Sequence, residues 1–204
     1  MNFDLETILN SFSLMSKWEI IAVLFGIAYI ILAAKESLWA WFFAFFGTLI
    51  YTIIFWEGQL LSSAILNFYY MIMAFYGYFM WRKHEEENDN IIIHSTSLSF
   101  HSKVIIIGTI ITIIIGYFMT KNTQTQLPYL DAFVMVFSVI TTWMLAHKIL
   151  ENWLYWIVID SAAVILYWKS GYYVTIILFI LYIILAFYGY FKWYKIKNSN
   201  LNEI

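Results

Sequence analysis

The sequence predicts an all-α integral membrane protein with seven transmembrane helices. Of its 204 residues, 63% are hydrophobic and only 12% are charged, and the apolar residues fall into seven separate runs. Soluble domains carry roughly 25% charged residues, and a bilayer core of about 30 Å requires about 20 mostly apolar helical residues. One transmembrane domain, 1–204, is expected, and its spans are 18–34, 38–56, 60–81, 104–120, 128–146, 152–169 and 172–193.

The first run is expected to be a retained span, because the residues before it contain Asp4 and Glu6 and lack a basic region. Short polar turns separate the second span from the third and the sixth from the seventh, so these neighbours are antiparallel. The one long connection, 82–103, precedes the fourth span. The chain has no cysteine and its four histidines show no metal-ligand spacing, so neither a metal nor a cofactor is expected.

The basic residues fall mainly on one face of this predicted bundle, with eight on one side and three on the other. The larger group is Lys35, Arg82, Lys83, Lys103, Lys148, Lys192, Lys195 and Lys197. The positive-inside rule places that face, with the C-terminus, in the cytoplasm and the N-terminus outside. Lys and Arg number 11 against 13 Asp and Glu, so no nucleic-acid partner is indicated.

A repeat divides the seven spans into two groups. The segment 74–83, AFYGYFMWRK, recurs 112 positions later at 186–195 as AFYGYFKWYK, with eight of ten residues identical. This offset predicts two parallel three-helix repeats, about 18–81 and 128–193, joined by a linker helix at about 104–120. In transporters built from such repeats the substrate site lies near the membrane midplane, between the repeats.

The candidate site is centred on Asp160, an acid in the middle of the sixth span. A carboxylate at this depth is unfavourable unless it faces protein, water or a partner. At 100° per residue it shares one face of its helix with several aromatic residues and an amide. The predicted substrate-binding set is Asn67, Tyr70, Asn152, Trp153, Trp156, Asp160, Trp41, Thr48, Tyr51, Tyr167 and Tyr182. Aromatic faces attract cations, so a flat cationic ring is the expected cargo.

Other interpretations of these residues remain open. Asn67 would also serve as a hydrogen-bonding contact between helices, and Asp160 would also pair with His147 or Lys148 reaching inward. An interfacial aromatic belt is expected at the cytoplasmic end, beside basic residues, and consists of Trp81, Trp193 and Tyr194.

The segments ENWLYWIVIDSAAVILYWKSGYY, DAFVMVFSVI, YGYFKW and NFYYMIMAFYGYFMW together resemble the PnuC family of bacterial vitamin transporters. This resemblance implies a 3+1+3 fold related to that of the SWEET sugar transporters, often assembled as a homotrimer in the inner membrane. It also implies facilitated diffusion of nicotinamide riboside, which a cytoplasmic kinase then phosphorylates and traps. The family's substrate-lining amides and indoles fall on Asn67, Asn152, Trp153 and Trp156.

The chain departs from that pattern at Asp160, where the riboside transporters commonly have an amide and the thiamine-carrying branch has an acid. Thiamine is therefore the alternative substrate. An intramembrane hydrolase is the rival of another class, but Ser161 and His147 are 14 residues apart, or roughly 21 Å along one helix. The third alternative is a structural subunit, which would show seams of small residues that are scarce here.

Overall fold

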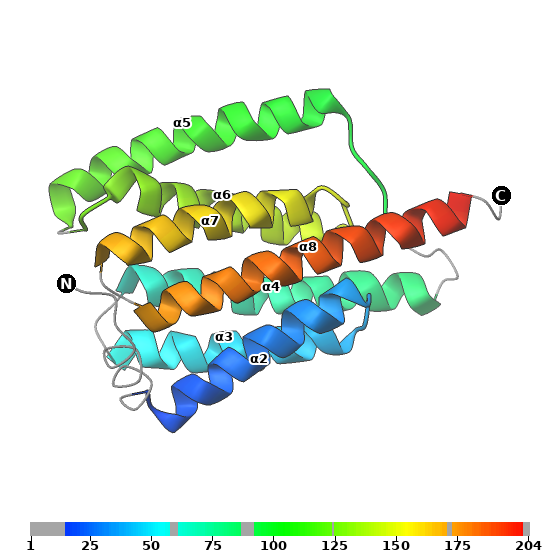
Figure 1. Ribbon diagram of the computed structural model, residues 1–204, viewed down its shortest axis with the longest axis horizontal. Coiled ribbons are helices and arrows are strands. Elements are labelled where there is room, and N and C mark those ends of the chain that lie inside the picture. The colour runs from blue at the N-terminus through cyan, green and yellow to red at the C-terminus, as the bar shows by residue number, and fades with distance from the viewer. Residues whose placement is uncertain (1–14, 58–60, 87–91, 124, 171–172, 202–204) are drawn as a thin grey trace.

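The computed structural model describes residues 15–57, 61–86, 92–123, 125–170 and 173–201. These residues form an all-α bundle whose helices run side by side (Figure 1). The helices are α2 (Lys17–Ala34), α3 (Trp39–Glu57), α4 (Leu61–Glu86), α5 (Leu98–Asn122), α6 (Pro128–Ala146), α7 (Asn152–Ser170) and α8 (Tyr173–Leu201). The end of the bundle at which α8 finishes is called the C-terminal end below.

The predicted spans coincide with these helices, but three helices are longer than the apolar runs. α4 and α8 continue past the predicted ends at 81 and 193, and α5 begins six residues before the predicted start at 104. The reason for α5 is a capping residue, because the Ser97 hydroxyl accepts a hydrogen bond from the backbone N–H of Phe100 at 3.3 Å. An apolar run thus marks the segment that a membrane can hold and does not mark where a helix ends.

Five of the described helices are long and apolar enough to cross a membrane, namely α2, α3, α5, α6 and the Val174–Ser199 part of α8. The other two, α4 and α7, lie along the bundle beside the five (Figure 1) but carry more polar residues. Asn67 and several tyrosines lie in α4, and Asn152 and Asp160 lie in α7. These are the two helices to which most of the candidate site residues belong.

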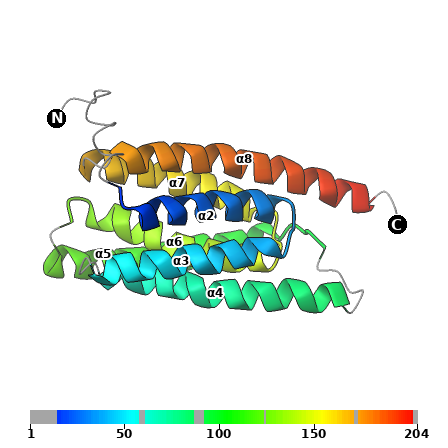
Figure 2. The ribbon, with the colours of Figure 1, turned by 90° about the horizontal axis from the view of Figure 1, so that it is seen from below.

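The contacts divide the helices into two groups, α2–α4 and α5–α8. α3 packs against both α2 and α4, and α7 packs against both α6 and α8. The groups meet where α2 contacts α8 and where α4 contacts α6; Figure 2 shows α8 beside α2. The two contacts are equivalent to each other, because an offset of 112 converts α2 to α6 and α4 to α8, so each contact pairs the first helix of one repeat with the third helix of the other.

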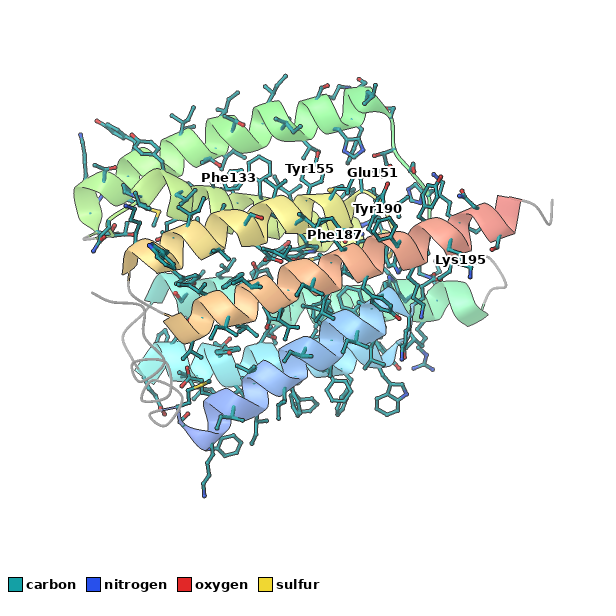
Figure 3. All side chains as sticks on the ribbon, in the orientation of Figure 1. Phe133, Glu151, Tyr155, Phe187, Tyr190 and Lys195 are labelled. Atoms are coloured by element: carbon teal, nitrogen blue, oxygen red, sulfur yellow. The ribbon has the colours of Figure 1, made fainter. Side chains whose placement is uncertain are left out.

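Helix α5 packs against α6 and exposes a row of isoleucines that suits contact with lipid. Its first turn is fixed to α7 by His101, whose Nδ1 lies 3.1 Å from the Tyr155 hydroxyl and whose Nε2 lies 3.8 Å from Glu151 Oε2. Glu151 and Tyr155 lie on the side of α7 that faces α5 (Figure 3). This contact holds α5 at the C-terminal end of the bundle.

The connection that leads into α5 is also fixed. The His94 carbonyl accepts a hydrogen bond from Leu150 N at 2.8 Å, and His94 N donates to the Lys148 carbonyl at 3.2 Å. Lys197 of α8 donates to the Ser95 hydroxyl, and Ile93 is buried in the core. The C-terminal end is therefore covered by ordered backbone that joins the α6–α7 turn to α8.

Candidate functional site

Four tryptophans, two from each repeat, form the core near the C-terminal end. Trp41 of α3 and Trp81 of α4 meet edge to face with ring centroids 5.1 Å apart, and Trp153 of α7 and Trp193 of α8 do so at 5.4 Å. Trp81 and Trp193 lie 6.4 Å from each other. Since 41 and 153, and 81 and 193, are separated by the repeat offset, the cluster has the symmetry of the repeat.

Trp81 and Trp193 are not interfacial, so the aromatic-belt interpretation is wrong for both. They are 4% and 0% exposed, respectively. The Trp81 indole N–H donates to the Ala146 carbonyl at 3.0 Å, and that of Trp193 donates to the Ala33 carbonyl at 3.2 Å. Neighbouring basic residues suggested a headgroup location, but the rings point into the bundle and bond to the opposite repeat.

The glycine of the repeated AFYGYF motif has a packing role in this cluster. A Cβ atom at Gly77 would lie 2.3 Å from Cζ2 of Trp41, and one at Gly189 would lie 2.6 Å from Cε3 of Trp153. Real atoms do not approach this closely without something moving. The two glycines therefore allow an indole to lie directly on the backbone of α4 or α8, which explains why the motif appears twice.

Several polar atoms in this region are buried without a partner among the described residues. They are Nε1 of Trp41, Nε1 of Trp153 and Oδ1 of Asn152. The Asn152 amide nitrogen donates to the Ile149 carbonyl at 2.6 Å, so only its oxygen is left over. Buried polar groups are normally hydrogen-bonded, which makes these three atoms candidates for binding a ligand.

Asp160 lies in a second cluster, which is made of tyrosines from both repeats. The carboxyl group is 4% exposed and is close enough to Tyr70 of α4 and Tyr182 of α8 to interact with them electrostatically. Tyr167 interacts in the same way with Tyr70 and with a further tyrosine of α3, Tyr51. Phenol groups of α4 and α8 thus lie near the acid.

The predicted site residues consequently fall at two levels. Eight positions separate Asn152 from Asp160 on α7, or about 12 Å at 1.5 Å per residue. Asn152, Trp153 and Trp41 lie at the tryptophan level, and Trp156 packs against that cluster from the side of Asp160. The tyrosine level holds Tyr51, Tyr70, Tyr167, Tyr182 and Asp160.

Two other predicted residues bond to their own helices. The Asn67 amide donates to the Ser63 carbonyl at 2.9 Å, and the Thr48 hydroxyl donates to the Ala44 carbonyl at 2.7 Å. Both side chains are half-buried. Their remaining acceptor atoms are the groups that they can offer to a ligand.

The structure does not support an internal basic partner for Asp160. Lys148 Nζ donates to Glu36 Oε2 at 2.7 Å, and His147 Nε2 lies 3.1 Å from the Tyr76 hydroxyl. His147 follows the end of α6 and Ser161 lies in α7, so the two are not on one helix, and the 21 Å spacing that was argued against a hydrolase does not apply. Ser161 is exposed and donates to the carbonyl of Ile157 in its own helix.

Sequence reasoning missed two positions that hold the tyrosines. Ser138 of α6 lies beside Tyr70, and a Cβ at Gly26 of α2 would lie 2.7 Å from the Tyr182 hydroxyl. Residues 26 and 138 are equivalent in the repeat, as are 70 and 182. Applying the offset of 112 to the neighbours of the tyrosines would have identified positions 26 and 138. Equivalent phenols thus have different neighbours, a glycine beside Tyr182 and a serine beside Tyr70.

Comparisons with known proteins identify a family and several relatives of this chain. The family model described as nicotinamide mononucleotide transporter matches residues 16–195. The nicotinamide riboside transporter PnuC of Escherichia coli (strain K12) is 24% identical, over 86% of this chain and 84% of that protein. The riboflavin/roseoflavin transporter RibM of Streptomyces davaonensis is 21% identical over the same shares.

A crystal structure of the vitamin B3 transporter PnuC has the same fold. It matches with a TM-score of 0.75 at 19% identity, covering 96% of this chain and 90% of that one. The resemblance to PnuC is thereby confirmed, as are an all-α fold and a multi-pass membrane protein. With a family model that spans nearly the whole length, this chain belongs to the nicotinamide mononucleotide transporter family.

Proposed function

We propose that this protein carries nicotinamide riboside across the bacterial cytoplasmic membrane. The observation that supports this most directly is Asp160, a buried acid without an ion-pair partner among the described residues, set among tyrosines between the repeats. A buried carboxylate is unfavourable unless it is paired. The cargo would supply the missing positive charge, and the pyridinium ring of nicotinamide riboside carries one permanently.

Thiamine is the second candidate, because its thiazolium ring is also a permanent cation and because the acid stands where the riboside transporters commonly have an amide. The relative RibM shows that the family includes a riboflavin/roseoflavin transporter. Riboflavin has an uncharged ring, so it would leave Asp160 without a counter-charge. The two cationic vitamins are therefore preferred over a flavin.

The proposed binding site uses the two levels differently. Phenol faces at the tyrosine level would surround the cationic ring next to Asp160. The free polar atoms of Trp41, Asn152 and Trp153 would meet hydroxyl or carboxamide groups of the cargo as it moves toward the C-terminal end. Asn67, Thr48 and Trp156 would line the space between these levels.

Transport in this proposal is passive, by facilitated diffusion, and phosphorylation by a cytoplasmic kinase retains the product. Seven membrane spans would form two parallel three-helix units, α2–α4 and α6–α8, with α5 as the linker, an arrangement supported by how these helices pack. The N-terminus would lie outside, the C-terminus in the cytoplasm, and copies of the chain would form a homo-oligomer, a trimer in the arrangement favoured here. Reporter fusions at the two termini test the topology, which a cytoplasmic signal from the N-terminal fusion would contradict.

Binding is the first test of the proposed function. Purified, monodisperse protein is titrated with nicotinamide riboside, thiamine and riboflavin while tryptophan fluorescence or heat is recorded. We expect saturable binding of at least one cationic vitamin, followed by its uptake into proteoliposomes. Binding of riboflavin alone, or of none of the three, would refute the proposal.

A further inference from the structure

An ion pair joins the two repeats at equivalent positions. Lys148 Nζ lies 2.7 Å from Glu36 Oε2, and these side chains are 14% and 23% exposed. The two residues are separated by the repeat offset of 112, and each follows the end of the first helix of its repeat, α2 or α6. A contact between equivalent positions must lie on the axis that relates the repeats.

The backbone at both positions is unusual. Glu36 has φ 55° and Lys148 has φ 52°, and they are the non-glycine residues with positive φ in the described part of the chain. This left-handed conformation is unfavourable for a residue with a side chain, so it persists where surrounding contacts hold it. Here the left-handed conformation turns the backbone just after the end of each helix, and the Glu36 and Lys148 side chains are in contact.

The tryptophans add two further links around the ion pair. Trp81 of the first repeat bonds to the backbone at Ala146 in the second, and Trp193 of the second bonds to Ala33 in the first. The Lys148 ammonium also lies over the Trp81 ring, 5.1 Å from its centroid. One ion pair, two indole hydrogen bonds and one cation–π contact thus connect the repeats at this end.

We propose that these contacts form a gate that closes the C-terminal end of the transport path. The inference rests on the proposed function, in which the cargo moves from Asp160 between the repeats to that end. The path along the axis meets the tryptophan cluster and then the Glu36–Lys148 pair. Water can replace an ion pair and N–H···O bonds when they separate, so the gate can open while each group of helices keeps its own packing.

A thiol-labelling experiment tests the gate without any cargo. The chain has no cysteine, so Ala186→Cys places a single thiol in the buried cluster that contains Trp153 and Trp193. Adding Glu36→Gln should raise the rate of labelling by a water-soluble maleimide about fivefold or more, as expected for a lost contact of this kind. The exchanged pair, Glu36→Lys with Lys148→Glu, should return the rate toward its original value.

The matched control is Glu151→Gln. It removes the acid that lies beside His101 of α5 and leaves the Glu36–Lys148 ion pair unchanged. It should not change the labelling rate at position 186. Equal labelling rates for Ala186→Cys with and without Glu36→Gln would show that the ion pair does not close this end, and the gate would be rejected.

Crosslinking tests whether the gate opens during transport. Cysteines introduced as Glu36→Cys and Lys148→Cys are joined with a flexible, cleavable bis-methanethiosulfonate reagent, and each single variant treated alike is the control. Joining them should reduce uptake to background and leave vitamin binding in place, and reduction should restore uptake. Unchanged uptake in the joined protein would overturn the gate. If the unaltered protein carries neither vitamin, the proposed function fails, and the labelling result still decides the gate.

Discussion

Replacing Asp160 with asparagine is the most direct test of its role, because the side chain keeps its size and loses its charge. Asp160 is 4% exposed and lies near tyrosines from both repeats. Lys148, which the sequence offered as an internal partner, is committed to Glu36. The charge of Asp160 is therefore available to a cationic cargo, and the substitution removes that attraction alone.

The expected loss follows from the strength of a charge-assisted contact. Such a contact contributes about 1.5–3 kcal/mol, so Asp160→Asn should weaken the binding of nicotinamide riboside or thiamine about 10- to 150-fold. The same substitution should increase the stability of the protein without cargo. A buried carboxylate without an ion partner is destabilising, and its removal should raise the unfolding midpoint, by about 2–4 °C for each kcal/mol gained.

The assay compares dissociation constants of the unaltered and Asp160→Asn proteins for a cationic and an uncharged form of one ligand. Nicotinamide riboside and its reduced form, in which the ring has lost its charge, make this pair. Affinity for the cation should fall and affinity for the reduced form should not. Equal affinities of both proteins for the cation, with normal folding, would show that Asp160 serves only the structure.

Two further predictions concern packing. Gly77→Ala should lower the unfolding midpoint by about 4–8 °C, because overpacking against Trp41 costs about 3 kcal/mol and the higher helix propensity of alanine contributes about 1 kcal/mol. Thermal unfolding followed by tryptophan fluorescence measures the midpoint. An unchanged midpoint would contradict the clash. The comparison variant Gly47→Ala, where a Cβ would lie 3.3 Å from Phe25 Cβ, should lower the midpoint less than Gly77→Ala. His101→Ala should free the first turn of α5, seen as faster amide hydrogen exchange near Ser97, with Tyr155→Phe giving a smaller effect; exchange that does not change would refute the anchoring contact.

The apolar runs determined the all-α fold and its helices in advance. A run of apolar residues in a membrane protein must be helical, because lipid offers no hydrogen-bond partner to a free backbone group. The boundaries at 128–146 were predicted without error. The acid at 160 could also be recognised as unusual from its position alone.

The sequence could not show which aromatic residues are buried or which charges meet. Trp81 and Trp193 have the same basic neighbours as a membrane-interface residue would have, and only their contacts with the opposite repeat show that they are core residues. Nor could helical periodicity divide the predicted site into two levels or pair Glu36 with Lys148 across the axis. Periodicity gives the direction of a side chain around its own helix, whereas its partners depend on how the helices are placed against one another, which is a property of tertiary packing.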